Sequence, residues 1–144
     1  MGEKKVLVVN GANMDLLGKR DPGAFGADTL DILMGELVDY GKEMGVQVSL
    51  FQSNVEGEVI NILHEAMGQY DGVIMNPGSF GHYSIGIKEA IDAMPIPCIE
   101  VHLANFYRKP ENKSVLAPVC RGLVCGFGRD TYKTALDGML KITG

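Results

Sequence analysis

The sequence predicts an α/β fold in which a parallel sheet lies between two layers of helices. Two observations lead to this prediction. Short apolar runs alternate with segments of helical period along the whole chain, and these runs are rich in Val and Ile without alternating polar residues. Strands that are buried on both faces have this character, and strand–helix alternation with short connections is typical of βαβ units.

The individual elements follow in chain order. Five strands are predicted, at residues 5–10, 46–52, 72–76, 97–102 and 122–128. Four helices are predicted, at residues 30–41, 57–70, 84–94 and 130–142. The polar residues predicted to cap or precede these helices are Asp28, Thr29, Asn54, Glu56 and Asp130. Five strands in 144 residues fit a flavodoxin-like three-layer sandwich with strand order 2-1-3-4-5. No linker or repeat interrupts them, so residues 1–144 are predicted to form one domain.

The composition excludes several classes of partner. A net charge of −5 argues against a general nucleic-acid binder or a protein of acidic membrane surfaces, because both need a basic face. The apolar run at residues 6–9 is too short for a signal peptide or a membrane span. Cys98, Cys120 and Cys125 are an odd number without metal-ligand spacing, which favours buried thiols in a reducing compartment. A cytoplasmic location is therefore expected.

Polar residues gather at one predicted rim of the sheet. Asn13 follows the first strand, Asn76 and His82 follow the third, and Glu100 and His102 end the fourth. Ligands of open parallel sheets bind beyond the carboxyl ends of the strands, near the point where strand order reverses. We therefore expect a binding site at this rim.

Common cofactor motifs do not fit. The loop after the first strand lacks the glycine spacing of a phosphate-binding loop, and residues 126–131 lack the third glycine of a dinucleotide site. His64 begins a helical zinc motif that has no second histidine, and no acidic cluster accompanies the three histidines. The sequence therefore predicts no cofactor and no metal. Acid–base chemistry on a polyol remains, because amides orient hydroxyls, imidazoles move protons and Arg holds carboxylates.

Several rim segments together resemble one enzyme family. The stretches "NGANMDLLGKRDPGAFG", "FQSNVEGEVINILHEA", "MNPGSFGHYS", "KEAI" and "IPCIEVHLAN" are similar, in order and spacing, to motifs of the type II 3-dehydroquinate dehydratases, or type II dehydroquinases. The resemblance implies a flavodoxin-like subunit assembled as a dodecamer built from trimers. It also implies a small-molecule substrate, a cyclic polyhydroxy keto acid. The implied reaction is the cofactor-free anti elimination of water from 3-dehydroquinate through an enolate.

The resemblance also implies catalytic roles. His102 matches the general acid that protonates the leaving hydroxyl, and Glu100 matches the carboxylate that orients that histidine. Asn13 matches the asparagine that holds a water against the enolate. Arg20 matches an arginine of the substrate lid that lies beside the catalytic base. Phe25 stands where the family has a tyrosine as that base, so the hydroxyl that accepts the proton is missing here.

Substrate contacts are implied in the same way. Asn76 and His82 match residues that grip the ring hydroxyls, and Glu89 stands where an aspartate of the family reaches a neighbouring subunit's site. The further expected substrate-binding residues lie just after the fourth strand: Leu103, Ala104 and Arg108. Ala104 replaces a serine that binds the substrate carboxylate in the family.

These departures leave three functions open. The protein is a dehydroquinase in which Tyr107, Tyr83 or Asp21 replaces the base, or a related lyase or isomerase acting on another polyhydroxylated ring or keto acid. The third possibility is a catalytically silent homologue that binds a ring metabolite or serves as a structural assembly. The resemblance is compatible both with aromatic biosynthesis through the shikimate pathway and with quinate breakdown.

Overall fold

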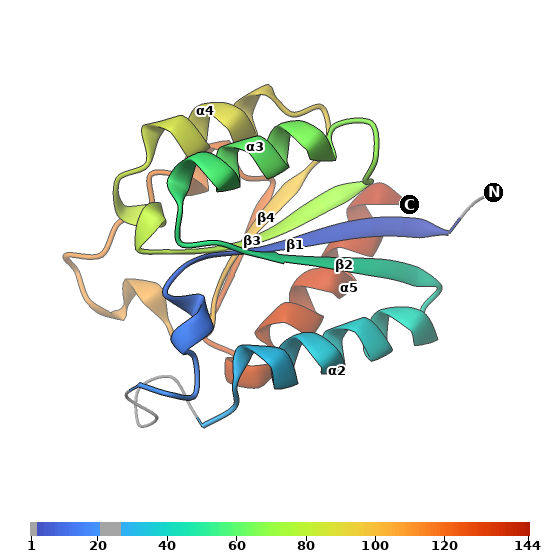
Figure 1. Cartoon of the computed structure of the whole chain (residues 1–144), viewed down its shortest axis with the longest axis horizontal. Helices are drawn as coiled ribbons and strands as arrows, with labels where there is room; N and C mark the ends of the chain where they lie inside the picture. Colours follow the sequence, from blue (N-terminus) through green and yellow to red (C-terminus); the bar gives the residue numbers. More distant parts are fainter. Residues whose placement is uncertain (1–2, 21–26) are drawn as a thin grey trace.

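The sheet has the predicted architecture. A computed structural model describes residues 3–20 and 27–144. Its five strands are all parallel and lie in the order β2-β1-β3-β4-β5, which confirms the predicted fold class and strand order. The strands span β1 (Lys4–Ala12), β2 (Val46–Gln52), β3 (Gly72–Gly78), β4 (Cys98–His102) and β5 (Gly122–Cys125). Figure 1 shows helices packed on both faces of this sheet.

Two pairs of helices form the outer layers. Helices α2 (Leu30–Glu43) and α5 (Thr131–Thr143) cover one face, and α3 (Glu56–Ala66) and α4 (Ile85–Ala93) cover the other (Figure 1). Each layer buries its own apolar cluster against the strands. Short 3-10 turns within the described ranges connect the elements: η1 (Met14–Leu16), η2 (Ser79–His82), η3 (Phe106–Arg108), η4 (Ala117–Val119) and η5 (Gly128–Asp130). No helix of residues 3–20 and 27–144 is long and apolar enough to cross a membrane.

The predicted ends of some elements needed correction. The prediction that β5 runs to residue 128 is wrong, because Gly126 and Gly128 adopt positive φ angles of 93° and 57°, which turn the chain out of the sheet. Thr29 caps α2 as predicted, since its hydroxyl accepts a hydrogen bond from the Ile32 amide. Asp130 precedes α5 without a side-chain capping bond, because its φ and ψ of −92° and −1° already lie in the helical region.

The start of α3 also differs from the prediction. Val55, not Asn54, stands at the N-cap position, and no side chain caps the helix there. The amide oxygen of Asn54 instead accepts a hydrogen bond from the backbone of Asn13, 2.7 Å away. Asn54 therefore links the segment that follows β2 to the segment that follows β1.

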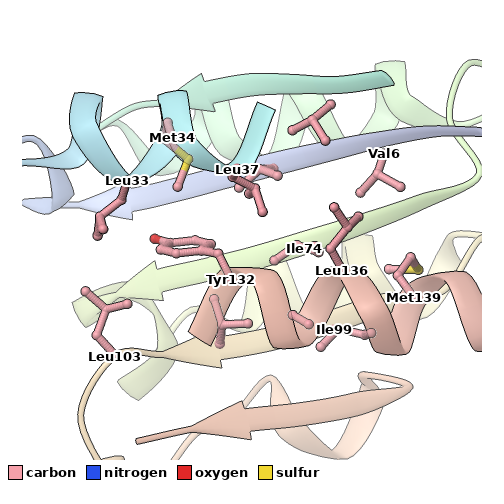
Figure 2. Close-up of a cluster of buried hydrophobic side chains, with 14 of the residues drawn as sticks. Val6, Leu33, Met34, Leu37, Ile74, Ile99, Leu103, Tyr132, Leu136 and Met139 are labelled. Carbon is pink, nitrogen blue, oxygen red and sulfur yellow. The ribbon is translucent and has the colours of Figure 1, made fainter. Parts of the chain in front are cut away.

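One polar network lies inside the α2–α5 core. The Tyr132 ring of α5 packs among apolar side chains of this cluster (Figure 2). Its hydroxyl donates to Asn10 Oδ1 of β1 at 2.5 Å and accepts from Asn76 Nδ2 of β3 at 3.0 Å. Burial raises the pKa of Tyr132, which keeps the hydroxyl protonated as a donor. Helix α5 is thereby joined to the two central strands where they reach the predicted rim.

Removing the Tyr132 hydroxyl tests this network. The Tyr132→Phe substitution should lower the free energy of unfolding by about 1–3 kcal/mol, because buried Asn10 Oδ1 and Asn76 Nδ2 both lose their bond to the hydroxyl. Urea denaturation measures the change. The matched control is Tyr40→Phe, which removes a hydroxyl bonded to Asp137 near the surface and should change stability by about 0.5 kcal/mol or less. Equal effects of the two substitutions would contradict the structural role of the buried network.

Candidate active site

A cavity of about 480 Å³ lies at the carboxyl ends of β1, β3 and β4. Its walls combine the predicted rim residues with the segment after β4. The lining residues are Ala12, Asn13, Met14, Arg20, Asn76, Gly78, Ser79, His82, His102, Leu103, Ala104, Asn105, Phe106, Arg108, Lys109 and Asn112. Residues from four separate parts of the sequence therefore share one cavity, at the rim where the strand order predicts a ligand site.

Close backbone contact brings the ends of β1 and β3 together. A Cβ atom on Gly11 would lie 2.2 Å from the carbonyl oxygen of Pro77, so only glycine allows this approach. Asn13 follows with a φ of 66°, a left-handed conformation that Asn tolerates better than most residues. The resulting turn places Asn13 in the cavity wall close to Asn76.

The general acid predicted by the family resemblance is part of a buried pair. Glu100 has no exposed surface, and its Oε2 lies 2.5 Å from Nε2 of His102, which is 8% exposed. The other carboxylate oxygen accepts a hydrogen bond from the Ser114 hydroxyl at 2.7 Å. Ser114 itself accepts from the amides of Leu116 and Ala117, so its only proton is directed at Glu100. The buried carboxylate is therefore paired and hydrogen-bonded on both oxygens.

This pairing defines what His102 can do. A carboxylate accepts hydrogen bonds, so Nε2 carries a proton toward Glu100, and Nδ1 is the nitrogen left for a ligand. The side chain lines the cavity. His102 thus presents Nδ1 to a bound molecule.

An aromatic side chain links the two cavity histidines. The Phe106 ring stacks on His102 with centroids 4.1 Å apart and on His82 with centroids 5.3 Å apart. Sequence reasoning missed Phe106 and Ser114, because the segment after β4 has no periodic pattern from which contacts can be inferred. It also missed Tyr132, which orients Asn76 from a helix 56 residues further along the chain.

The cavity wall is positively charged although the protein is acidic. Arg20, Arg108 and Lys109 line the cavity, and none of the described lining residues is Asp or Glu. The whole chain carries a net charge of −5. Such a local field favours an anionic ligand in a molecule that repels anions elsewhere.

The other predicted site residues lie as follows. Leu103 and Ala104 line the cavity, whereas Glu89 is exposed on α4 and does not line it. Phe25 lies outside the described residues, so its predicted place in the site stays a prediction. Asp21 lies outside them too.

The two tyrosines predicted as replacement bases do not line the cavity. Tyr83 is 56% exposed and Tyr107 is 45% exposed. Desolvation and the charge of Glu100 raise the pKa of Tyr107, which makes it a poorer source of phenolate. Neither hydroxyl is therefore placed to accept a proton from a molecule in this cavity.

Known proteins share this sequence and this fold. The family model described as dehydroquinase class II matches residues 4–140. A 3-dehydroquinate dehydratase of Bacillus licheniformis is 45% identical over 134 residues, covering 92% of each chain. One of Clostridium perfringens is 43% identical over 140 residues, covering 95% of this chain and 96% of the other.

Solved structures give the same result. A type II dehydroquinase of Butyrivibrio crossotus superposes with a TM-score of 0.93 at 35% identity, covering 96% of this chain and 98% of the other. A 3-dehydroquinate dehydratase-like protein of Bifidobacterium longum superposes with a TM-score of 0.72 at 31% identity, covering 96% and 97%. The match over nearly the whole chain confirms the family resemblance: this chain belongs to the class II dehydroquinase family.

Proposed function

We propose that this protein is a 3-dehydroquinate dehydratase, a hydro-lyase that removes water from a cyclic polyhydroxy keto acid without a cofactor. The observation that carries the proposal is the pairing of His102 with the buried Glu100 inside a cavity that also presents amides and cations. An acid, hydroxyl-binding amides and a cationic wall are what the elimination of water from such an anion requires. The two relatives described above are named 3-dehydroquinate dehydratases, which supports the same activity.

The acid step follows from the geometry of His102. Its Nδ1 proton passes to the oxygen of the leaving hydroxyl as the C–O bond breaks, and water departs with the bonding electron pair. Glu100 accepts the hydrogen bond of Nε2 and so leaves Nδ1 as the nitrogen that faces the substrate. Ser114 keeps the carboxylate in place. These three side chains form the acid half of the site.

The other cavity residues bind different groups of the substrate. Asn76 and His82 contact the ring hydroxyls, and Asn13 acts through a bound water on the enolate oxygen, as the resemblance implies. The hydrogen bond from Asn76 Nδ2 to the Tyr132 hydroxyl fixes the orientation of the Asn76 amide for this contact. Arg108 and Lys109 hold the carboxylate, together with Leu103 and the segment at Ala104, whose methyl group replaces a hydrogen-bonding serine.

The base half of the site is altered. Phe25 replaces the tyrosine that accepts the carbon-bound proton in the family, and Arg20, its predicted neighbour, lines the cavity. Tyr83 and Tyr107 lie outside the cavity lining, so neither is proposed as the substitute. A positioned general base contributes about 10²–10⁴-fold to the rate, and we therefore propose slow turnover.

Assembly and location belong to the same proposal. A dodecamer built from trimers, with Glu89 reaching a neighbouring site, is supported by exposed apolar side chains that a free subunit would leave in water. These are Leu50, Val55, Tyr83 and Ile85, which are 46–56% exposed.

The three free cysteines support a reducing compartment, and we propose the cytoplasm.

Incubation with 3-dehydroquinate tests the activity. The purified protein should form the conjugated enone product, which absorbs in the ultraviolet, and His102→Asn should slow its formation by about 10²–10⁴-fold. Isothermal titration with the same compound measures binding separately. Binding without product would identify a silent homologue. Neither binding nor product would point to a different ring or keto acid, and each result would contradict the proposed function.

Restoring the missing hydroxyl tests the base half. The Phe25→Tyr substitution should raise kcat by about 10²–10⁴-fold, because it supplies a proton acceptor to a site whose acid half is already in place. KM should change far less, since the added oxygen acts in the transition state. Enone absorbance measures both constants. A variant no faster than the wild type would show that proton abstraction does not take place at this position.

The cationic wall predicts a selective loss of binding. Arg108→Gln should raise KM by about tenfold to a hundredfold, because a charge-assisted hydrogen bond to the carboxylate is worth about 1.5–3 kcal/mol. The wild-type KM should also rise with salt concentration. Arg121→Gln is the matched control, since Arg121 is exposed at the amino end of β5, away from the cavity. Equal KM values for both variants would exclude Arg108 from carboxylate binding.

A further inference from the structure

We propose that Phe106 is a positioning residue that holds His102 and His82 in a fixed mutual arrangement and promotes the departure of the leaving hydroxyl through His102. The catalytic part of this inference rests on the proposed function. Phe106 itself transfers no proton and forms no polar bond to a substrate through its side chain. Its contribution is the placement of two imidazoles that come from different elements.

The ring contacts both imidazoles face to face. Its plane makes an angle of 24° with His102, 4.1 Å away between centroids, and 29° with His82, 5.3 Å away. His102 ends β4, whereas His82 ends η2 after β3. A third contact, edge-on from Tyr107 at 5.1 Å and 82°, supports the ring from the segment that follows it. The separations of 5.3 and 5.1 Å are those of favourable aromatic pairs, and the His102 contact at 4.1 Å is closer still.

The backbone of Phe106 is held by a side chain. Its carbonyl accepts a hydrogen bond from Asn112 Nδ2 at 2.7 Å. The turn before it is fixed by the amide of Gly126, which donates to the His102 carbonyl at 3.0 Å. The ring is therefore attached to the sheet and does not depend on the histidines for its own position.

Stacking supplies the restraint that Glu100 does not. The bond from Nε2 to Glu100 is a single contact in the plane of the imidazole, about which the ring can still swing. A parallel aromatic ring on the face of His102 opposes that motion and fixes the direction of Nδ1 into the cavity.

The removal of the carbon-bound proton should depend less on the restraint of His102 by Phe106. Proton removal from carbon precedes the departure of the hydroxyl in an enolate mechanism, and it uses a different group from His102. Loss of Phe106 should therefore slow the breaking of the C–O bond and leave the exchange of the carbon-bound proton nearly unchanged. A purely structural residue would slow both steps together.

The test compares Phe106→Leu, which removes the aromatic face at similar volume, with Phe106→Tyr, which keeps it. Phe127→Leu is the matched control, because Phe127 is 61% exposed and does not line the cavity. Proton–carbon correlation spectra of the imidazole groups, assigned with His82→Gln and His102→Gln, report the stacking without any turnover. Enone formation and solvent-deuterium exchange at the carbon beside the ketone report the two chemical steps.

We expect Phe106→Leu to move the ring-proton resonances of both His82 and His102. Placed on the Phe25→Tyr variant, in which proton removal is no longer slow, Phe106→Leu should lower kcat for enone formation by about 10- to 100-fold. Its deuterium exchange should stay within about threefold of that of Phe25→Tyr alone, and Phe106→Tyr should restore both measurements. Unchanged histidine resonances, or exchange and elimination slowed equally, would overturn the proposal. A wild-type protein that forms no enone overturns the proposed function instead, and the resonances alone then decide whether Phe106 positions the histidines.

Discussion

The site depends on the burial of one carboxylate. Glu100 lies in β4 with no exposed surface, and an ionised carboxyl group in such a place is very costly unless it is paired and hydrogen-bonded. The strand itself supplies the first partner, because residues two apart on a strand face the same side of the sheet and His102 follows Glu100 at that spacing. The second partner, Ser114, is available only if the chain turns back after β4. The two oxygens of Glu100 are thus bound by one residue of the same strand and by one residue from the loop that follows it.

The returning segment builds much of the cavity wall. To bring Ser114 to Glu100, residues 103–113 form an arc over the rim, and this arc carries Phe106, Arg108 and Lys109. The next residue, Val115, donates its amide to the Gly81 carbonyl of η2 at 2.8 Å. The loop is therefore held to both histidine-bearing elements. The same returning segment therefore brings Ser114 to the buried Glu100 and places Arg108 and Lys109 in the cavity wall.

The sequence was a good guide to everything that depends on local pattern. Apolar runs and helical period predicted all five strands and their order, since strand burial and short crossovers leave few topologies. It also placed Asn76, His82 and His102 at one rim. What it could not provide were contacts between elements distant in the chain. Tyr132 holds Asn76 across 56 residues, and Asn54 binds the Asn13 backbone instead of capping α3. Such partners are set by packing, not by spacing.

Membership of the family and catalytic strength are separate physical properties in this chain. The fold rests on two apolar clusters and the Tyr132 network, and the acid half of the site rests on buried hydrogen bonds among Glu100, His102 and Ser114. The proposed base half depends on the side chain at position 25, where phenylalanine and tyrosine differ by one oxygen atom. Identity of 45% to a dehydratase over 92% of the chain therefore establishes membership of the family, whereas the proposed slow turnover rests on the absence of that single oxygen.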